Sequence, residues 1–112
     1  MDYSRQFLEQ VVTAKIDRPA GSKHPKHDYF YPINYGFIPG TKAPDDEELD
    51  AYVLGSNKPL DSFTGKCIAI IHRTDNDDDK LVLAEDGKAY SDEEIISQTY
   101  FQEQWFKSII VR

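Results

Sequence analysis

The sequence predicts a mainly β domain of the α+β class: a small closed or highly curved β-barrel with a C-terminal helix packed against it. Three observations lead to this expectation. About five short segments have the composition of strands, one segment begins with a helix-capping signature, and the strands precede the helix. The 112 residues fit one domain and leave little room for a second, so residues 1–112 are treated as a single domain.

The first half of the chain contains periodic segments separated by loop signals. Residues 3–12 fit one helical face and residues 12–16 alternate as in a strand, so a short helix running into a strand satisfies both patterns. Residues 18–28 contain two prolines and a glycine, which indicates a loop. Residues 49–54 alternate partly and predict a short strand.

The segment after residue 65 predicts a β-hairpin. Residues 66–72 make an apolar strand, residues 75–79 an acidic turn, and residues 80–85 the return strand. Cys67 lies in the first of these strands, where a buried and unreactive thiol is expected. Because it is the only cysteine, no intramolecular disulfide can form, which is compatible with a reducing compartment.

A helix is expected to follow the hairpin. Ser91 with Glu94 three residues later is a capping box, and it starts a helix predicted over residues 92–107. Residues 108–112 fit either the fraying end of this helix or a final strand.

The composition limits the classes of partner. The formal net charge of −7 argues against nucleic acid, since proteins that bind nucleic acid usually present a basic surface. No apolar run approaches the ~18 residues that a membrane span needs, and the N-terminus lacks a basic segment followed by an apolar one. We therefore expect a cytoplasmic protein with no membrane partner. An acidic protein that handles an anion must concentrate its cations locally or recruit metal ions.

An acidic run at residues 45–50 is the first candidate for a site. Five of its six residues are acids, and metal ions are a common reason to bring carboxylates together, because Mg²⁺ prefers oxygen ligands. Alternate residues of a strand face the same side, so Asp45 and Glu47 can point together and Asp50 can join them through a bend. Taken alone, this run also fits a solvated acidic loop.

Three further segments carry candidate contacts to phosphate or metal. The aromatic block 30–40 contains Tyr31 and Tyr35, whose hydroxyls can donate to phosphate oxygens or can simply belong to core aromatics. Residues 74–80 carry four aspartates and end in a lysine, which fits either metal ligands beside a phosphate contact or an ordinary turn. Residues 23–28 form the densest cationic patch and lack the spacing of a zinc site.

Taken in this order, the segments resemble the family I soluble inorganic pyrophosphatases. The strongest match is the block from Tyr31 to Gly40, Tyr-Pro-Ile-Asn-Tyr-Gly-Phe-Ile-Pro-Gly, followed closely by Asp45-Asp-Glu-Glu-Leu-Asp50. The likeness covers roughly residues 15–107, and boundaries of this kind hold to about 2–4 residues. It implies an OB-like barrel that hydrolyses inorganic pyrophosphate to two phosphates with the help of metal ions.

The resemblance also assigns roles to individual residues. It implies metal ligands at Asp17, Asp28, Asp45, Asp50, Asp75 and Asp78. It implies contacts to phosphate from Lys26, Tyr31, Tyr35, Lys80 and Lys107. The implied catalytic residues are Glu47, in the position of the base that acts on the attacking water, together with Asp50, Lys26 and Tyr35. The implied cofactor is Mg²⁺, with Mn²⁺ as the other cation that accepts carboxylate oxygens. The implied partners are a small phosphate-containing substrate and further copies of the chain in a homo-oligomer.

The chain departs from the family pattern at several of these positions. Glu47 stands where the family has aspartate, and Asp17 and Asp28 replace glutamates, so the charge is kept and the reach changes by one methylene. Phe106 replaces a tyrosine that donates to phosphate.

The largest departure is a deletion between Asp28 and Tyr31. The family inserts a hairpin here that carries a phosphate-binding arginine, whereas only two residues separate these positions in this chain. An arginine contact to phosphate is strong because the guanidinium can donate two parallel hydrogen bonds. Arg18 and Arg73 are the candidates to replace it.

These departures leave alternative functions open. The shortened rim fits a hydrolase of a larger phosphoanhydride or a nucleotide. The changes at Glu47 and Phe106 fit a metal- or phosphate-binding module without catalysis. An acidic barrel with no site is the remaining alternative, and the order of the matching segments argues against it.

Overall fold

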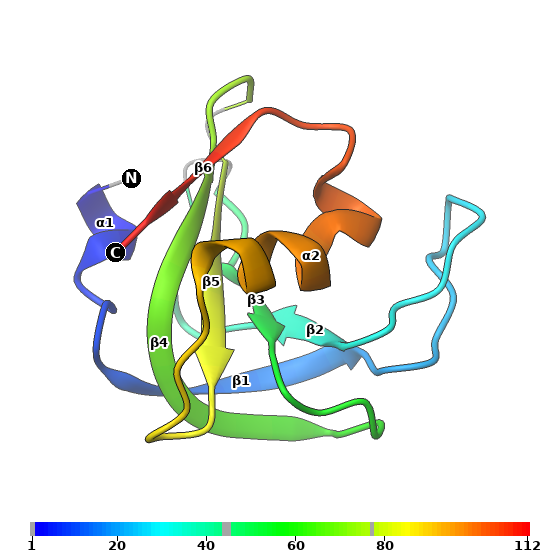
Figure 1. The fold of residues 1–112 in the computed structure, drawn as a ribbon, viewed down its shortest axis with the longest axis horizontal. Coiled ribbons are helices and arrows are strands. Elements are labelled where there is room, and N and C mark those ends of the chain that lie inside the picture. The colour runs from blue at the N-terminus through cyan, green and yellow to red at the C-terminus, as the bar shows by residue number, and fades with distance from the viewer. Residues whose placement is uncertain (1, 44–45, 77) are drawn as a thin grey trace.

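The computed structural model describes residues 2–43, 46–76 and 78–112. Figure 1 shows the elements in chain order, which are α1 (Asp2–Arg5), β1 (Val11–Arg18), β2 (Asn34–Phe37), β3 (Asp50–Val53), β4 (Ser62–Arg73), β5 (Asp78–Ala84), α2 (Asp92–Glu103) and β6 (Ser108–Val111). The predicted α+β class with a dominant β component is therefore confirmed.

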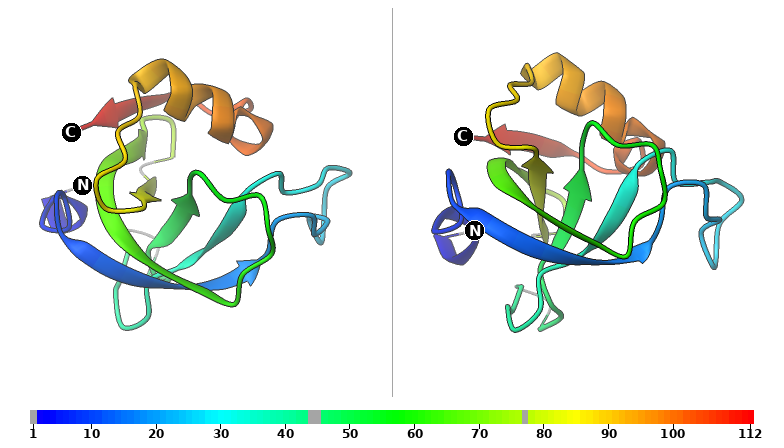
Figure 2. Two further views of the ribbon diagram at one scale, coloured as in Figure 1. Left: turned by 60° about the horizontal axis from the view of Figure 1, so that its bottom comes forward. Right: turned by 90° about the horizontal axis from the view of Figure 1, so that it is seen from below.

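The strands of the described residues form one six-stranded sheet in the order β1-β2-β3-β5-β4-β6. The sheet is strongly curved, and β1 also pairs with β4, so the first five strands close into a ring. β4 makes this possible because its first residues pair with β1 while its later residues pair with β5 and β6. Figure 2 shows the long β1 and β4 wrapping around the shorter strands, as predicted for a highly curved barrel.

The two faces of the sheet bury two apolar clusters. Strand alternation sends Ala51 and Val53 of β3 into the inside of the ring and turns Tyr52 toward α2. The inner cluster consists of Ala14, Ile16, Ile38, Ala43, Leu49, Ala51, Val53, Cys67, Ile70, Leu81 and Leu83. The outer cluster lies under α2, where Ile95 is fully buried. The capping box at Ser91 is present as predicted, with the side-chain oxygen of Ser91 accepting from the Glu94 N–H at 3.1 Å.

The N-terminal and hairpin predictions are largely confirmed, whereas β2 lies in a segment for which no strand was predicted. Residues 34–37 contain Gly36, which weakens a strand by propensity. Here the glycine is required, because a Cβ at Gly36 would collide with the backbone of Lys15 and Ile16 on β1. The close approach of the β1 and β2 backbones therefore explains why a glycine stands in the middle of β2.

The C-terminal end of α2 differs from the prediction. The helix ends at Glu103 instead of residue 107, and residues 108–111 form β6, which settles the alternative in favour of a final strand. Long-range hydrogen bonds explain the early end: the Lys107 N–H donates to the Asp75 carboxylate at 3.1 Å, and the Lys107 carbonyl accepts from the Thr74 N–H at 2.8 Å. β6 then pairs with β4, so the helix is not the last element as expected.

The acidic turn of the hairpin is shorter than predicted. Asp78 and Asp79 belong to β5, where they pair with Arg73 and His72 of β4. Among the described residues, no helix is long and apolar enough to span a membrane.

Candidate active site

A cavity of about 620 Å³ lies between the outer face of the sheet and the C-terminal end of α2. Strands β1, β2, β3, β4 and β5 supply one wall, and the loop before β2 supplies another. The lining residues are Asp17, Arg18, His24, His27, Tyr29, Tyr31, Tyr35, Asp50, Arg73, Lys80, Gln102, Trp105 and Phe106. One end of this pocket is charged and the other is aromatic.

Lys80 is the centre of the charged end. β3 and β5 run parallel with Asp50 paired to Lys80, so these two side chains start from neighbouring positions on the same face. The Lys80 ammonium donates to the Asp50 carboxylate at 2.5 Å and to the Asp78 carboxylate at 3.0 Å. Because the Lys80 side chain is only 5% exposed, two carboxylates hold its charge in a largely dry environment.

A β-bulge brings Asp17 and Arg18 to the same end. The register of β1 against β2 shifts between Ile16 and Arg18, which leaves Asp17 as the extra residue of the bulge. Burial raises the pKa of the Asp17 carboxyl; Arg18 opposes this shift and the charge of Asp50 adds to it. The Arg18 guanidinium lies 3.9 Å from the Asp17 carboxylate and stays partly exposed. The bulge thus turns one acid and one arginine toward the pocket.

Tyr35 and Tyr31 form the floor between the two ends. Burial raises the pKa of Tyr35 well above its ordinary value, and the charge of Asp50 and a hydrogen bond with Asp50 act in the same direction. The Tyr31 hydroxyl donates to Gln102 Oε1 of α2 at 2.7 Å, and burial raises its pKa as well. Both phenols therefore stay protonated and able to donate at neutral pH.

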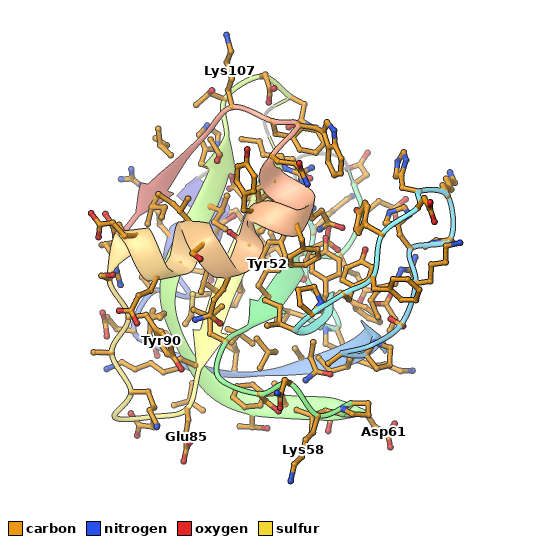
Figure 3. All side chains as sticks on the ribbon, turned by 45° about the vertical axis from the view of Figure 1, so that its right-hand side comes forward. Tyr52, Lys58, Asp61, Glu85, Tyr90 and Lys107 are labelled. Carbon is orange, nitrogen blue, oxygen red and sulfur yellow. The ribbon has the colours of Figure 1, made fainter. Side chains whose placement is uncertain are left out.

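Arg73 forms a second cationic wall through a buried network. Its guanidinium donates to the Glu103 carboxylate at 3.0 and 2.7 Å and lies 3.6 Å from the centre of the Phe106 ring. The Tyr52 hydroxyl also donates to Glu103, at 2.6 Å. Although burial disfavours the charge of Arg73, the bonds to Glu103 raise its pKa above the ordinary value. Figure 3 shows Tyr52 beneath α2, where this network ties the helix to the sheet.

The aromatic end is built by the loop before β2 and the chain after α2. Trp105 stacks with Tyr29 at 5.5 Å and with His27 at 6.4 Å between ring centres. His27 and Tyr29 are nearly parallel, with an interplanar angle of 5°. Nδ1 of His24 accepts from the backbone N–H groups of Lys26 and His27, which fixes the shape of this loop.

The structure brings together part of the set of site residues predicted from the sequence. Five of them line the pocket: Asp17, Tyr31, Tyr35, Asp50 and Lys80. Asp78 does not line the pocket, but its carboxylate accepts a hydrogen bond from Lys80 at the charged end. Asp45 lies outside the described residues.

The other predicted residues lie away from the pocket lining. Asp28 is almost fully exposed and pairs with Lys23 at 3.2 Å, and Lys26 is exposed on the same loop. Glu47 is exposed, as are its neighbours in the loop before β3. The Asp75 carboxylate accepts a hydrogen bond from the backbone N–H of Lys107. The Lys107 side chain extends away from the body of the molecule in Figure 3. Their roles stay predictions.

Several pocket residues were not among the predicted site residues. Arg18 and Arg73 were named only as candidates to replace the missing arginine, and both line the pocket. Gln102 and Trp105 lie on and just after α2, and their spacing along the chain gave no signal of a site. His24 and His27 belong to the cationic patch at residues 23–28, and positive charge in an otherwise acidic chain was the one signal that pointed to this loop.

The charged end fits a hard divalent cation by the chemistry of its donors. Asp17 and Asp50 face one pocket, and the charge of Asp50 contributes to the raised pKa of Asp17, so a cation near both carboxylates would relieve their repulsion. Over the part of the chain that the structure describes, no three histidine, cysteine or acidic side chains stand close enough together to hold a metal ion. The donor type fits, and the described residues alone do not supply a complete set of ligands.

Fold and pocket together define a small acidic protein with a highly curved β-sheet closed into a ring and a pocket that combines cationic and acidic side chains. The family model for inorganic pyrophosphatase matches residues 12–110. The chain belongs to the inorganic pyrophosphatase family, and the resemblance found in the sequence is confirmed.

A curated relative agrees with this assignment, and two solved structures share the fold. A curated inorganic pyrophosphatase of Pseudomonas aeruginosa is 37% identical over 76 residues, covering 56% of this chain and 43% of that protein. The match thus spans less than half the length of that relative. The crystal structure of inorganic pyrophosphatase from Ehrlichia chaffeensis superposes with a TM-score of 0.68 at 18% identity over 90% of this chain and 84% of the other. The Neisseria gonorrhoeae inorganic pyrophosphatase structure gives a TM-score of 0.55 at 28% identity over 81% of this chain and 68% of the other.

Proposed function

We propose that this protein hydrolyses inorganic pyrophosphate to two phosphates in a reaction that requires a divalent cation, with Mg²⁺ as the cation. The observation that carries the proposal is the pairing of Asp50 with Lys80 across β3 and β5, which joins a carboxylate and a cation at the charged end of one pocket. Family membership supports the same reaction.

The carboxylates of the charged end would hold the metal ion. Asp17 and Asp50 are the ligands that the pocket supports, and Asp28, Asp45, Asp75 and Asp78 are the further ligands that the sequence predicts. A bound Mg²⁺ lowers the pKa of a coordinated water and offsets negative charge on phosphate. This accounts for the ability of a chain with a net charge of −7 to accept a highly charged anion.

The cations of this chain would bind the phosphate oxygens. Lys80 has three N–H donors, of which two go to Asp50 and Asp78, so its third can donate to a phosphate in the pocket. Arg18 lines the same end and is partly exposed. Its guanidinium would therefore bind phosphate in place of the arginine that the family carries on the hairpin missing from this chain. Tyr35, a neutral phenol with a raised pKa, has a single O–H, so donation to a phosphate would replace its hydrogen bond with Asp50 and would add no charge.

The base and the outer lysines keep the roles that the sequence predicts. Glu47 would accept a proton from the attacking water or orient it, and Lys26 and Lys107 would contact phosphate. Because these three side chains are exposed and do not line the pocket, the roles require the loops that carry them to approach the substrate. A homo-oligomer in the cytoplasm is the expected context.

A paired substitution tests this proposal. Asp50→Asn removes a carboxylate of the charged end, and we expect it to lower phosphate release from pyrophosphate at least 100-fold at saturating Mg²⁺. Asp61→Asn is the matched control, because Asp61 is an exposed carboxylate that does not line the pocket and lies at the lower end of the molecule in Figure 3, and it should retain full activity. Equal activity of the two folded variants would contradict the proposal.

A further inference from the structure

The pocket is much larger than a pyrophosphate ion requires. Its volume of about 620 Å³ lies in the range of roughly 300–1,000 Å³ that is typical of sites for drug-sized ligands. The charged groups occupy one end only. The remaining space is bordered by His27, Tyr29 and Trp105.

A continuous series of rings connects the charged end to this aromatic end. The Lys80 ammonium lies 5.7 Å from the centre of the Tyr35 ring, and Tyr35 lies 5.5 Å from Tyr31. Tyr31 in turn lies 5.9 Å from Tyr29, which stacks on Trp105. A ligand that places phosphates at the charged end and a planar group beside Trp105 therefore needs a spacer between the two.

Trp105 is placed to receive such a planar group. Its ring belongs to a nearly parallel trio with His27 and Tyr29, with interplanar angles of 24° and 28°, and yet its side chain is 60% exposed. A tryptophan that served only to anchor the loop would bury most of its surface. Exposed aromatic faces of this kind bind the π-faces of nucleic-acid bases.

We propose that the pocket binds a nucleoside 5′-diphosphate, with the base on Trp105 and the diphosphate at Arg18 and Lys80. The ribose then spans the floor formed by Tyr35 and Tyr31. The proposal rests on the proposed function, because the diphosphate takes the place of pyrophosphate in the charged end. It extends the ligands of that site from an inorganic anion to a phosphoanhydride that carries a planar base.

The single tryptophan of the chain provides a direct readout, because all tryptophan fluorescence comes from Trp105. The probes are ADP and inorganic pyrophosphate, each with Mg²⁺, and adenosine without phosphate. We expect ADP to quench the fluorescence in a saturable manner and pyrophosphate alone to leave it nearly unchanged. Addition of pyrophosphate to the ADP complex should restore the signal, since both compete for the charged end.

Calorimetry of variants then separates stacking from folding. Trp105→Ala should weaken ADP binding roughly 5- to 150-fold, which is the range expected for loss of one base-stacking ring, and leave pyrophosphate binding within twofold. Trp105→Phe keeps a ring and should restore most of the ADP affinity. Tyr100→Ala is the matched control, because Tyr100 is an exposed aromatic of α2 that does not line this pocket, and it should change neither affinity.

The outcomes distinguish the proposal from the function on which it rests. If pyrophosphate is hydrolysed but ADP does not quench Trp105, or binds Trp105→Ala as tightly as the unsubstituted protein, the nucleotide proposal is wrong and the pyrophosphatase proposal stands. If ADP binding depends on Trp105 but the folded protein hydrolyses no pyrophosphate, the proposed function fails and the nucleotide pocket is supported. ADP that pyrophosphate cannot displace would overturn the placement of the diphosphate.

Discussion

The Lys80 ammonium on β5 contacts the Asp50 carboxylate on β3 at 2.5 Å, although thirty positions separate the two residues along the chain. The contact follows from the backbone, because β3 and β5 are parallel and pair these two residues directly. Asp78, two residues before Lys80 on the same strand face, completes the group at 3.0 Å. A lysine thus lies between two carboxylates at the charged end.

Removal of the lysine charge should make stability depend on Mg²⁺. Lys80→Gln removes the ammonium that both Asp50 and Asp78 contact and leaves Asp78 with the Arg73 guanidinium at 3.7 Å, and we expect a loss of roughly 3 kcal/mol in the free energy of unfolding in the presence of a chelator. Because Mg²⁺ can replace the missing charge, the variant should regain more stability from Mg²⁺ than the unsubstituted protein does. Urea denaturation with and without Mg²⁺ measures both effects.

The control for this variant is Lys88→Gln, which removes an exposed lysine and should leave stability within about 0.5 kcal/mol. A Lys80→Gln protein that is fully stable in chelator would show that the two carboxylates do not depend on Lys80.

Arg18 should contribute to the binding of pyrophosphate. Arg18→Ala removes the partly exposed guanidinium at the charged end, so we expect KM for pyrophosphate to rise about 10-fold or more, as is usual for loss of a charge-assisted contact. Steady-state kinetics at saturating Mg²⁺ provides the measurement. Arg5→Ala, at an exposed arginine of α1, should behave like the unsubstituted protein. An unchanged KM in Arg18→Ala would show that Arg18 does not contact pyrophosphate.

Glu103 should be required for stability as the partner of Arg73. Glu103→Gln removes the charge that balances a guanidinium only 8% exposed, and the remaining amide can accept fewer hydrogen bonds from Arg73 and Tyr52. We expect a loss of roughly 3 kcal/mol in the free energy of unfolding, measured by denaturant titration. Glu93→Gln in the exposed first turn of α2 should cost less than about 1 kcal/mol. Equal stability of the two variants would show that the hydrogen bonds of Glu103 with Arg73 and Tyr52 do not stabilise the fold.

Cys67 should be unreactive and should influence stability only at high pH. Burial raises the pKa of its thiol from 9.0 to about 11. The folded protein therefore holds this proton more tightly than the unfolded chain, so stability present below pH 9.0 is lost as the pH rises toward 11. Because buried tyrosines act in the same direction, the measurement compares Cys67→Ala with the unsubstituted protein, and the variant should lose stability less steeply over this interval.

A second readout for Cys67 is alkylation at pH 8. The native thiol should resist a thiol reagent that labels the denatured chain completely. Rapid labelling of the native protein would show that the strand around Cys67 opens readily.

The sequence predicted the parts of the fold and site that depend on local patterns. Ser91 and Glu94 define the start of α2, and the alternation around Tyr52 identifies β3 and, with it, Asp50. Asp17 and Lys80 were predicted from the resemblance, and the structure brings both to the pocket. These residues lie in or beside strands, whose positions the apolar pattern determines.

What the sequence did not predict depends on contacts between distant segments. The end of α2 at Glu103 follows from bonds between Lys107 and the Asp75 turn, which no local propensity encodes. The stacking of Trp105 on Tyr29 joins residues far apart in the chain. Likewise, the network of Arg73 with Glu103 arises only when α2 packs on the sheet.

The most direct test of the central claim is the release of phosphate from pyrophosphate by the unsubstituted protein as a function of Mg²⁺ concentration. We predict release that rises with Mg²⁺, stops when a chelator removes the cation, and resumes when Mg²⁺ is added back. A folded protein that releases no phosphate at any Mg²⁺ concentration, or releases it equally well in chelator, would show that this chain is not a Mg²⁺-dependent pyrophosphatase.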